Sequence, residues 1–436
     1  MFDLTLAMIF GTLSGVLIGL LPGFGMSTCL LLFSPFLIQQ SLIFCLLFYC
    51  CASSASQYFG SVTTLSLRIP GETTSLPLLE IMKNNDFSKR IGDIYFLTSF
   101  GSLFASLITG AIIILFYSYF LFFIGYLKTY VMFVFCILGF FLCVFFSENK
   151  VLVSLFLFIF GWTISKIGYD SIQNINFLTF DNVYLYGGIP TLPVIMGIYA
   201  IPSLIKMFSY VKNIEKTTSQ VLLTKSKILL ISENYKTIFI SSFVGFIMGL
   251  IPYLGSGMSS YIGYFLDKKR QKNDFVSNAV ASETANNSAN LSVLVPLVFL
   301  GIAIIPSEFL LLEILPLGNK ALTFIDIQPY LIIMFFLLLF SNIFCFYLSW
   351  NFIQLILNLI SKLNYFVPII LIIGIICSIL YIGNDYNQAF YYLIVFVFSG
   401  IFGIYFNSKD LLPFIYAFML QNNFENVLYR MMIIYL

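Results

Sequence analysis

The chain consists of long apolar stretches joined by short polar connections. A helix that crosses a bilayer uses about 20 predominantly apolar residues, and several stretches reach this length. Others are closer to half-helices or re-entrant segments, and these short stretches cluster around breaks that contain Gly and Pro. The pattern predicts an all-α polytopic membrane protein with roughly ten to twelve membrane segments, some of them broken or re-entrant. The apolar stretches lie at about 4–21, 26–50, 93–124, 130–147, 151–165, 190–208, 237–252, 256–266, 289–304, 308–318, 329–350, 365–382, 389–406 and 411–420.

Composition excludes the soluble classes of protein. The chain is 60% hydrophobic and 9% charged, whereas an ordinary soluble domain is about 45–50% apolar and about 25% charged. These residues cannot supply a polar surface for a water-soluble fold, and a net charge of +2 indicates no nucleic-acid partner. The chain has no histidine, and its eight cysteines lie in apolar runs without zinc-ligand spacing. We therefore expect no enzyme activity, no metal site and no cofactor other than a coupling cation.

A basic polar stretch divides the chain into two halves. Residues 206–236 contain six Lys against two Glu. We predict one membrane repeat over 1–205, a basic linker over 206–236 and a second membrane repeat over 237–436. Two further basic groups, around residues 83–90 and 268–272, join the linker as candidate cytoplasmic loops. Parallel and inverted repeats both remain possible, because the number of crossings between the halves is not fixed by the pattern.

The two halves share a motif. A G-x-x-x-G-L-[LI]-P run followed by a Gly-rich break and Met-Ser occupies residues 15–27 and 245–259. A Ser/Thr/Asn-rich patch follows each run about 30 residues later, at 51–61 and 282–290. The paired glycines at the start of each run are typical of close helix packing. The Pro-Gly breaks point to function, because unpaired backbone inside an apolar segment is tolerated only where it lines an enclosed cavity.

Broken helices of this kind are used by transporters to bind anions. Their half-helix N-termini direct positive dipole ends at substrate near the membrane midplane. The candidate breaks are residues 22–25 and 252–257, with a third at 69–75. Arg68, immediately before the third break, is a candidate clamp for a substrate carboxylate. The alternative for Arg68 is a side chain that extends to the lipid headgroups.

Glu283 is the most informative acidic residue. Asn286, Asn287 and Asn290 follow it at +3, +4 and +7, which places all four on one helical face. A carboxylate with carboxamide oxygens suits a hard cation such as sodium, or a proton if Glu283 is protonated, and ionisable groups inside a membrane are functional candidates. The alternative is the start of a cytoplasm-facing helix, which Ser282 could cap.

At these residues the chain resembles a known family, the large membrane subunit of the tripartite tricarboxylate transporters (TctA-type). The order and spacing of several motifs together support the likeness, which extends over nearly the whole chain. The motifs are GLLPGFG at 19–25, YFGSVTT at 58–64, IPGET at 69–73, IGYD at 167–170, FLTF at 177–180, GGIPTLPVIMGIYAI at 187–201, GLIP at 249–252, ETANNS at 283–288, LGI at 300–302 and the tail at 412–430.

The resemblance implies a two-repeat secondary transporter subunit that imports carboxylates, driven by an ion gradient, in the bacterial inner membrane. It also implies two partners: a small membrane subunit, and an extracytoplasmic binding protein that hands over the substrate. Together with the residues above, it places coupling-ion binding at Glu283, Asn286, Asn287 and Asn290. The predicted substrate-binding residues are Pro22, Gly23, Gly25, Ser27, Ser61, Thr63, Thr64, Arg68, Pro70, Gly71, Thr73, Gly255, Gly257, Asn286 and Asn287.

The second repeat departs from the family pattern. The family's second Pro-Gly-x-Gly is Pro252-Tyr-Leu-Gly here, and Ser282 replaces the Pro before the family's Glu. The family's second Gly-Ile-Pro-Gly is replaced by GIAI at 301–304. A divergent member with an altered substrate is the natural interpretation. Two alternatives stay open: a degenerate relative that does not transport, and a membrane protein similar to a lipid or glycan flippase.

Overall fold

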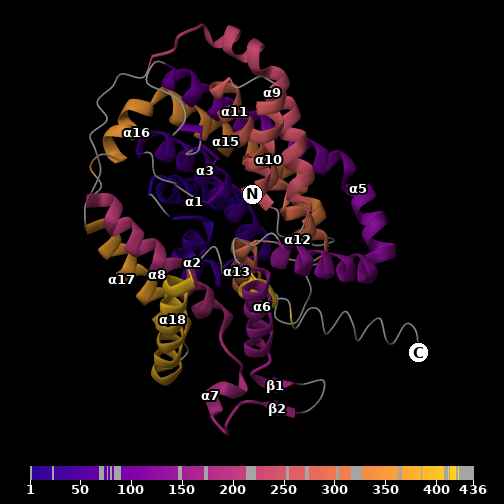
Figure 1. Ribbon diagram of the computed structural model, residues 1–436, viewed down its shortest axis with the longest axis vertical. Helices are drawn as coiled ribbons and strands as arrows, with labels where there is room; N and C mark the ends of the chain where they lie inside the picture. The colour runs from indigo at the N-terminus through magenta and orange to yellow at the C-terminus, as the bar shows by residue number, and fades with distance from the viewer. Residues whose placement is uncertain are drawn as a thin grey trace.

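The computed structural model describes most of the chain (Figure 1). The described residues are 2–21, 24–67, 73–75, 77–78, 81–82, 90–145, 150–170, 175–212, 222–251, 255–270, 274–300, 303, 305–315, 327–360, 362, 366–383, 385–406, 411, 413–418 and 421. Helices dominate them, as the apolar stretches predict.

The first half of the chain contains the elements α1 (Phe2–Gly19), α2 (Met26–Leu37), α3 (Leu42–Leu67), η1 (Thr73–Ser75), α5 (Ile91–Phe145), α6 (Val151–Ser165), β1 (Gly168–Asp170), β2 (Ile175–Phe177), α7 (Val183–Tyr186) and α8 (Thr191–Lys212). The second half contains α9 (Lys227–Gly249), α10 (Gly255–Arg270), α11 (Phe275–Ser292), α12 (Leu294–Leu300), α13 (Pro306–Ile314), η2 (Gln328–Tyr330), α15 (Leu331–Asn351), α16 (Ile353–Ile360), α17 (Phe366–Ile382) and α18 (Tyr386–Phe406). Helices α8 and α9 both extend into the interval 206–236, so the predicted linker is partly helical.

Five helices among the described residues are long and apolar enough to cross a membrane. They are Phe2–Gly19, Leu42–Leu67, Ile91–Tyr119, Gln328–Asn351 and Tyr386–Phe406. Shorter apolar helices accompany them at Met26–Leu37, Val151–Ser165, Thr191–Ile205 and Phe366–Ile382, which are the lengths expected of broken or partial crossings. The protein is therefore an all-α polytopic membrane protein, as the sequence predicts.

One helix differs from the pattern of apolar stretches. The stretches 93–124 and 130–147 belong to a single helix, α5, which runs without interruption from Ile91 to Phe145. The short connection between the two stretches contains no proline. Its more polar residues therefore do not interrupt the hydrogen-bonded backbone of the helix. Figure 1 shows α5 along the outer edge of the molecule.

The repeated glycines bring helices into backbone contact in both halves. A Cβ atom on Gly15 of α1 would lie 2.2 Å from the carbonyl oxygen of Ala52 in α3. A Cβ atom on Gly245 of α9 would lie 2.2 Å from the carbonyl oxygen of Ala285 in α11. In the first half α1 thus packs closely against α3, and in the second half α9 packs closely against α11. Small residues are expected to be used in this way in membranes.

Two peripheral regions complete the fold. Helices α8, α17 and α18 pack against one another at one side of the molecule (Figure 1). Strands β1 and β2 form an antiparallel hairpin in which Tyr169 pairs with Asn176. The hairpin and α7 lie at the lower end of the molecule in Figure 1.

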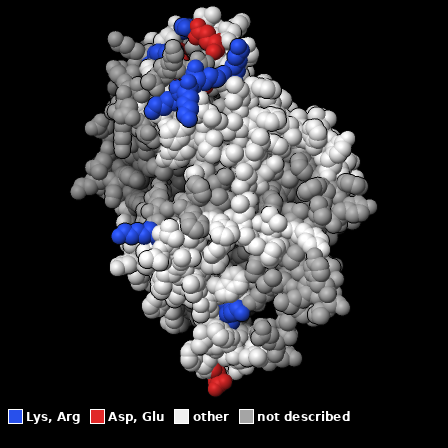
Figure 2. Space-filling view, turned by 45° about the vertical axis from the view of Figure 1, so that its right-hand side comes forward, with Lys and Arg blue, Asp and Glu red and all other residues white. Residues whose placement is uncertain are grey.

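The predicted basic loops come together at the other end of the molecule. Arg90 lies 3.3 Å from Asp274 at the start of α11 and 3.4 Å from Asp93 in α5. The Asp93 carboxylate, fully buried, also accepts a 2.9 Å hydrogen bond from the backbone N–H of Thr224, just before α9. Figure 2 shows most of the basic side chains in view gathered at one end. Arg90, the described end of the linker at Thr224 and the start of α11 therefore share one end, as loops on one side of a membrane do, while residues 83–89, 213–221 and 271–273 lie outside the described part of the chain.

Candidate functional site

Helix α11 is polar in sequence and yet buried along its length. Every residue from Val276 to Ser292 is buried, because α3, α5, α9 and α10 all pack against this helix. Asp274 caps its first turn by accepting a hydrogen bond from the backbone N–H of Val276. A helix this rich in Asn and Ser is unstable in an apolar interior unless its side chains find partners, so its surroundings define the candidate site.

The predicted Glu283 stripe lies at the centre of this helix. The side chains of Glu283, Asn286, Asn287 and Asn290 are each at most 4% exposed. Asn287 donates from Nδ2 to the hydroxyl oxygen of Ser102 in α5 at 2.8 Å, and to the carbonyl oxygen of Glu283 at 3.0 Å. The four residues share one face, as their spacing predicts.

Two carboxamide oxygens at this centre stand out. The Oδ1 atoms of Asn286 and Asn287 are buried and accept no hydrogen bond within the part of the chain that the structure describes. A buried carbonyl oxygen without a donor is costly, and such a group calls for an ion, a water or a ligand. Their Nδ2 groups are already engaged, so the amides present oxygen, the atom that hard cations prefer.

Contacts between α3 and α11 relate the two halves to each other. When the halves are aligned on their glycine contacts, Ser53 corresponds to Asn286 and Gln57 to Asn290. Ser53 donates to Oδ1 of Asn290 at 2.8 Å, and Asn286 donates from Nδ2 to Oε1 of Gln57 at 2.5 Å. Replacing each residue by its counterpart in the other half converts one hydrogen bond into the other. A two-fold axis between the halves would produce this relation. Ser53 contacts Asn290 and Gln57 contacts Asn286, so α3 and α11 run antiparallel at this contact. An antiparallel pair of corresponding helices favours inverted over parallel repeats.

The alignment also shows that the halves differ chemically at this centre. The counterpart of Glu283 is Cys50, and the counterpart of Asn287 is Ser54. The carboxylate and the two acceptor oxygens are therefore features of the second half alone. The departure of the second repeat from the family pattern does not extend to this stripe.

The third predicted break reaches the same centre. Thr74 in η1 donates to Oε1 of Gln57 at 3.3 Å, and its carbonyl oxygen accepts a 2.8 Å hydrogen bond from Ser260 in α10. The segment after residue 72 is thus held between α3 and α10, beside Asn286. The structure brings the polar patches of both halves and the end of this break together.

The predicted hydroxyl groups of α3 donate hydrogen bonds to backbone carbonyl oxygens. Thr63 donates to the carbonyl oxygen of Gly19 at 2.9 Å, at the end of α1, where carbonyl oxygens lack partners within the helix. Ser61 and Thr64 donate to carbonyl oxygens of their own helix, those of Tyr58 and Gly60. Thr63 thus links α3 to the end of α1, just before the first break, whereas Ser61 and Thr64 bond within α3.

The glycine breaks are described in part. Gly25 precedes α2, whose first turn has no side-chain cap, and Ser27 in that turn is half-buried. Gly255 starts α10 with φ +46°, a left-handed conformation that favours glycine. Apart from its own helix, no atom of the described residues lies within 4 Å of the Cβ position of Gly257. The described part of the chain does not include the other residues at the breaks, which are Pro22, Gly23, Arg68, Pro70, Gly71, Glu72 and Pro252. It includes the backbone of Thr73 but not its side chain.

The polar partners that α3 and α11 find on α5 and α15 were not predicted. Ser102 receives the Asn287 amide, and Thr109 forms a 2.7 Å hydrogen bond with Ser288. Asn342 of α15 accepts from Ser54 at 2.6 Å and from Ser106 at 3.0 Å. A signal for them does exist, since hydroxyl residues at 98, 102, 106 and 109 recur at helical spacing within an otherwise apolar stretch.

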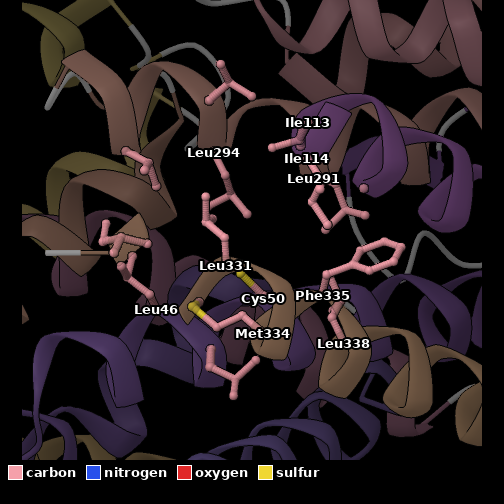
Figure 3. A pocket seen from close by; sticks show the side chains of 15 residues that line it. Leu46, Cys50, Ile113, Ile114, Leu291, Leu294, Leu331, Met334, Phe335 and Leu338 are labelled. Carbon is pink, nitrogen blue, oxygen red and sulfur yellow. The ribbon is translucent and has the colours of Figure 1, made fainter. Parts of the chain in front are cut away.

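An apolar cavity adjoins this polar centre. It has a volume of about 100 Å³ and lies between α3, α5, α12 and α15 (Figure 3). Leu46, Cys50, Leu291 and Met334 are among the side chains that surround it. Its walls contain almost no polar atoms, so it cannot bind a small anion by itself. The carboxamide cluster, and not this cavity, is the candidate site.

The fold and this site define a class of protein: a polytopic membrane protein with broken helices and a buried polar centre where the two halves meet. Comparison with known proteins names the family. The model of the Tripartite tricarboxylate transporter TctA family matches residues 5–415, so the chain belongs to this family of membrane transporter subunits, which is not a family of enzymes.

Comparisons with individual proteins are more distant. The chain is similar to an uncharacterized 52.8 kDa protein in the TAR-I ttuC' 3' region of Agrobacterium vitis, with 24% identity over 322 residues. The matched region covers 70% of this chain and 63% of that relative, so the chain spans less than two thirds of its length. No solved structure matches the chain.

Proposed function

We propose that the protein is the large membrane subunit of a sodium-coupled carboxylate importer, and that sodium binds at Glu283, Asn286 and Asn287. One observation supports this most directly: two buried carboxamide oxygens accept no hydrogen bond from the described residues, and a buried carboxyl group precedes them on the same helical face. Oxygen ligands suit a hard cation. A cation beside the Glu283 carboxylate would also lower the cost of burying its charge.

Sodium explains these oxygens better than a proton does. A proton could bind the Glu283 carboxylate, but the carboxamides of Asn286 and Asn287 do not titrate at physiological pH. Two buried acceptor oxygens on neighbouring residues would serve no purpose in a site for a proton alone. Asn290 has a different role, because its Oδ1 atom accepts from Ser53 and ties α11 to α3.

The substrate site is proposed beside the cation, at the breaks before α2 and α10 and at the end of the third break. The space next to Gly257 and the contact of Thr74 with Gln57 support this position. The family's tripartite organisation supports a small membrane subunit and an extracytoplasmic binding protein as partners. By the distribution of basic residues, the end that contains Arg90 would face the cytoplasm of a bacterial inner membrane.

Uptake into proteoliposomes tests this function. The chain would be reconstituted with its small membrane subunit and binding protein, and uptake of radiolabelled citrate and a panel of dicarboxylates would be measured. We expect uptake of at least one of them to require an inward sodium gradient and the binding protein. Equal uptake with potassium in place of sodium, driven by a pH gradient, would contradict the choice of ion. No uptake of any carboxylate under either gradient would contradict the proposed function.

A further inference from the structure

A second polar site lies between α9 and α10, away from the Glu283 stripe. It is a cavity of about 200 Å³. The residues around it are Thr237, Ile240, Ser241 and Val244 of α9, and Gly263, Leu266, Asp267 and Arg270 of α10. Hydroxyl groups and an ion pair at one end and aliphatic side chains at the other make this cavity amphipathic.

Two residues that line the cavity, Asp267 and Arg270, form an ion pair. Asp267 is 4% exposed, and its carboxylate accepts from Ser277 at 2.6 Å, from Thr237 at 3.1 Å and from Arg270 at 2.7 Å. Arg270 uses Nη2 for its bonds to Asp267 and Thr237. A guanidinium has five donors, and the hydrogen bonds that Arg270 donates to the described residues use Nη2, so Nε and Nη1 can serve another acceptor. The Arg270 side chain is 30% exposed, which makes it accessible from outside the bundle.

The electrostatic surroundings favour an anion. Lys268 and Lys269 precede Arg270, so the end of α10 carries three basic residues against the single carboxylate of Asp267. That carboxylate is already neutralised by Arg270 and two hydroxyl donors. The cavity therefore has the Arg270 guanidinium in its lining, and two further lysines in the same turn of α10 add positive charge to its surroundings.

The cavity lies where both helices pass from charged to uncharged sequence. Helix α9 has no charged residue after Lys236, and α10 has none before Asp267. Ile240 and Leu266, which line the cavity, are 42% and 45% exposed. Exposed aliphatic side chains directly beside a basic group are what the boundary between headgroups and acyl chains requires.

We propose that this cavity binds the headgroup of an anionic phospholipid. Its phosphate would accept hydrogen bonds from Arg270 and the hydroxyl group of Ser241, and the acyl chains would lie along Ile240, Val244 and Leu266. Basic pockets between membrane helices recognise anionic headgroups in this way. Because α9 and α10 both pack against α11, a lipid bound here would stabilise the helices around the Glu283 stripe.

Thermal unfolding of the purified protein in detergent tests the proposal. Phosphatidylglycerol should raise the unfolding midpoint by about 2 °C or more. Phosphatidylcholine and inorganic phosphate should not, since one lacks net negative charge and the other lacks acyl chains. Arg270→Gln should lose the shift, and Lys269→Gln, which removes an equal charge from an exposed neighbour outside the cavity, should keep it.

A second pair of variants leaves the ion pair intact. Ile240→Asp places a negative charge in the exposed wall of the cavity, while Phe239→Asp places it on the adjacent residue, which is 55% exposed and does not line the cavity. We expect Ile240→Asp to lose both the phosphatidylglycerol shift and the phospholipid that copurifies in native mass spectrometry, and Phe239→Asp to retain both. A shift that persists in both Arg270→Gln and Ile240→Asp would overturn the proposal. So would equal protection by phosphatidylcholine or phosphate, or cross-linking of an Ile240→Cys variant to another membrane subunit.

Discussion

Asn287→Ala should reduce sodium-driven carboxylate uptake to the background of empty vesicles, and Glu283→Gln should do the same. The alanine removes one of the two buried oxygens that we assign to the cation, together with the amide that donates to Ser102. The glutamine keeps the size of the side chain but removes the charge that a bound cation would balance. Both changes act at the ion site, so coupled uptake should fail even when substrate is saturating.

Membrane expression of both variants should stay intact. Ser102 also donates to the carbonyl oxygen of Thr98, so it retains a partner when the Asn287 amide is removed. Asn234→Ala is a matched control, because Asn234 is also buried and, among the described residues, donates within its own helix α9, to the carbonyl oxygen of Leu230. Uptake by that control should be close to wild type. Normal transport by both Asn287→Ala and Glu283→Gln would refute the site.

Gly15→Ala and Gly245→Ala should each destabilise the fold strongly. Alanine ordinarily favours a helix over glycine by about 1 kcal/mol. Here the added Cβ atom would meet a backbone carbonyl oxygen of the facing helix at 2.2 Å, and a backbone cannot move aside as a flexible side chain can. Forcing the helices apart costs about 1–3 kcal/mol, which outweighs the gain in helix propensity.

Thermal unfolding in detergent measures this effect, with Gly60→Ala as the control. Gly60 is also a buried glycine inside a helix, but no atom lies within 4 Å of its Cβ position. Its replacement should leave the unfolding midpoint unchanged or raise it. If Gly15→Ala and Gly245→Ala unfolded at the wild-type temperature, the close contacts of α1 with α3 and of α9 with α11 would be wrong.

Sequence periodicity was sufficient to predict the Glu283 stripe. The +3, +4 and +7 spacing is a local property of a helix, and the structure retains it without distortion. The glycine contacts were equally predictable in type, since a GxxxG pair indicates close packing. Composition alone established the class of fold.

The partners of the stripe could not be predicted in the same way. Gln57 and Ser102 meet Asn286 and Asn287 from segments far away in the sequence, and these pairings depend on tertiary packing. The hydroxyl residues of α5 lie within an apolar stretch, where they do not interrupt the hydrophobic pattern. Helix α11 shows the converse, because its polar composition excludes it from the apolar candidates for membrane crossing while the fold buries it completely.

Binding of radioactive sodium to the purified chain tests the central proposal most directly. Measured by scintillation proximity without substrate or partners, wild type and Asn234→Ala should bind sodium saturably, and unlabelled sodium should compete while potassium should not. Asn287→Ala and Glu283→Gln should show no saturable binding. Saturable binding that is unchanged in both variants, or its absence from the wild type, would contradict a sodium site on α11.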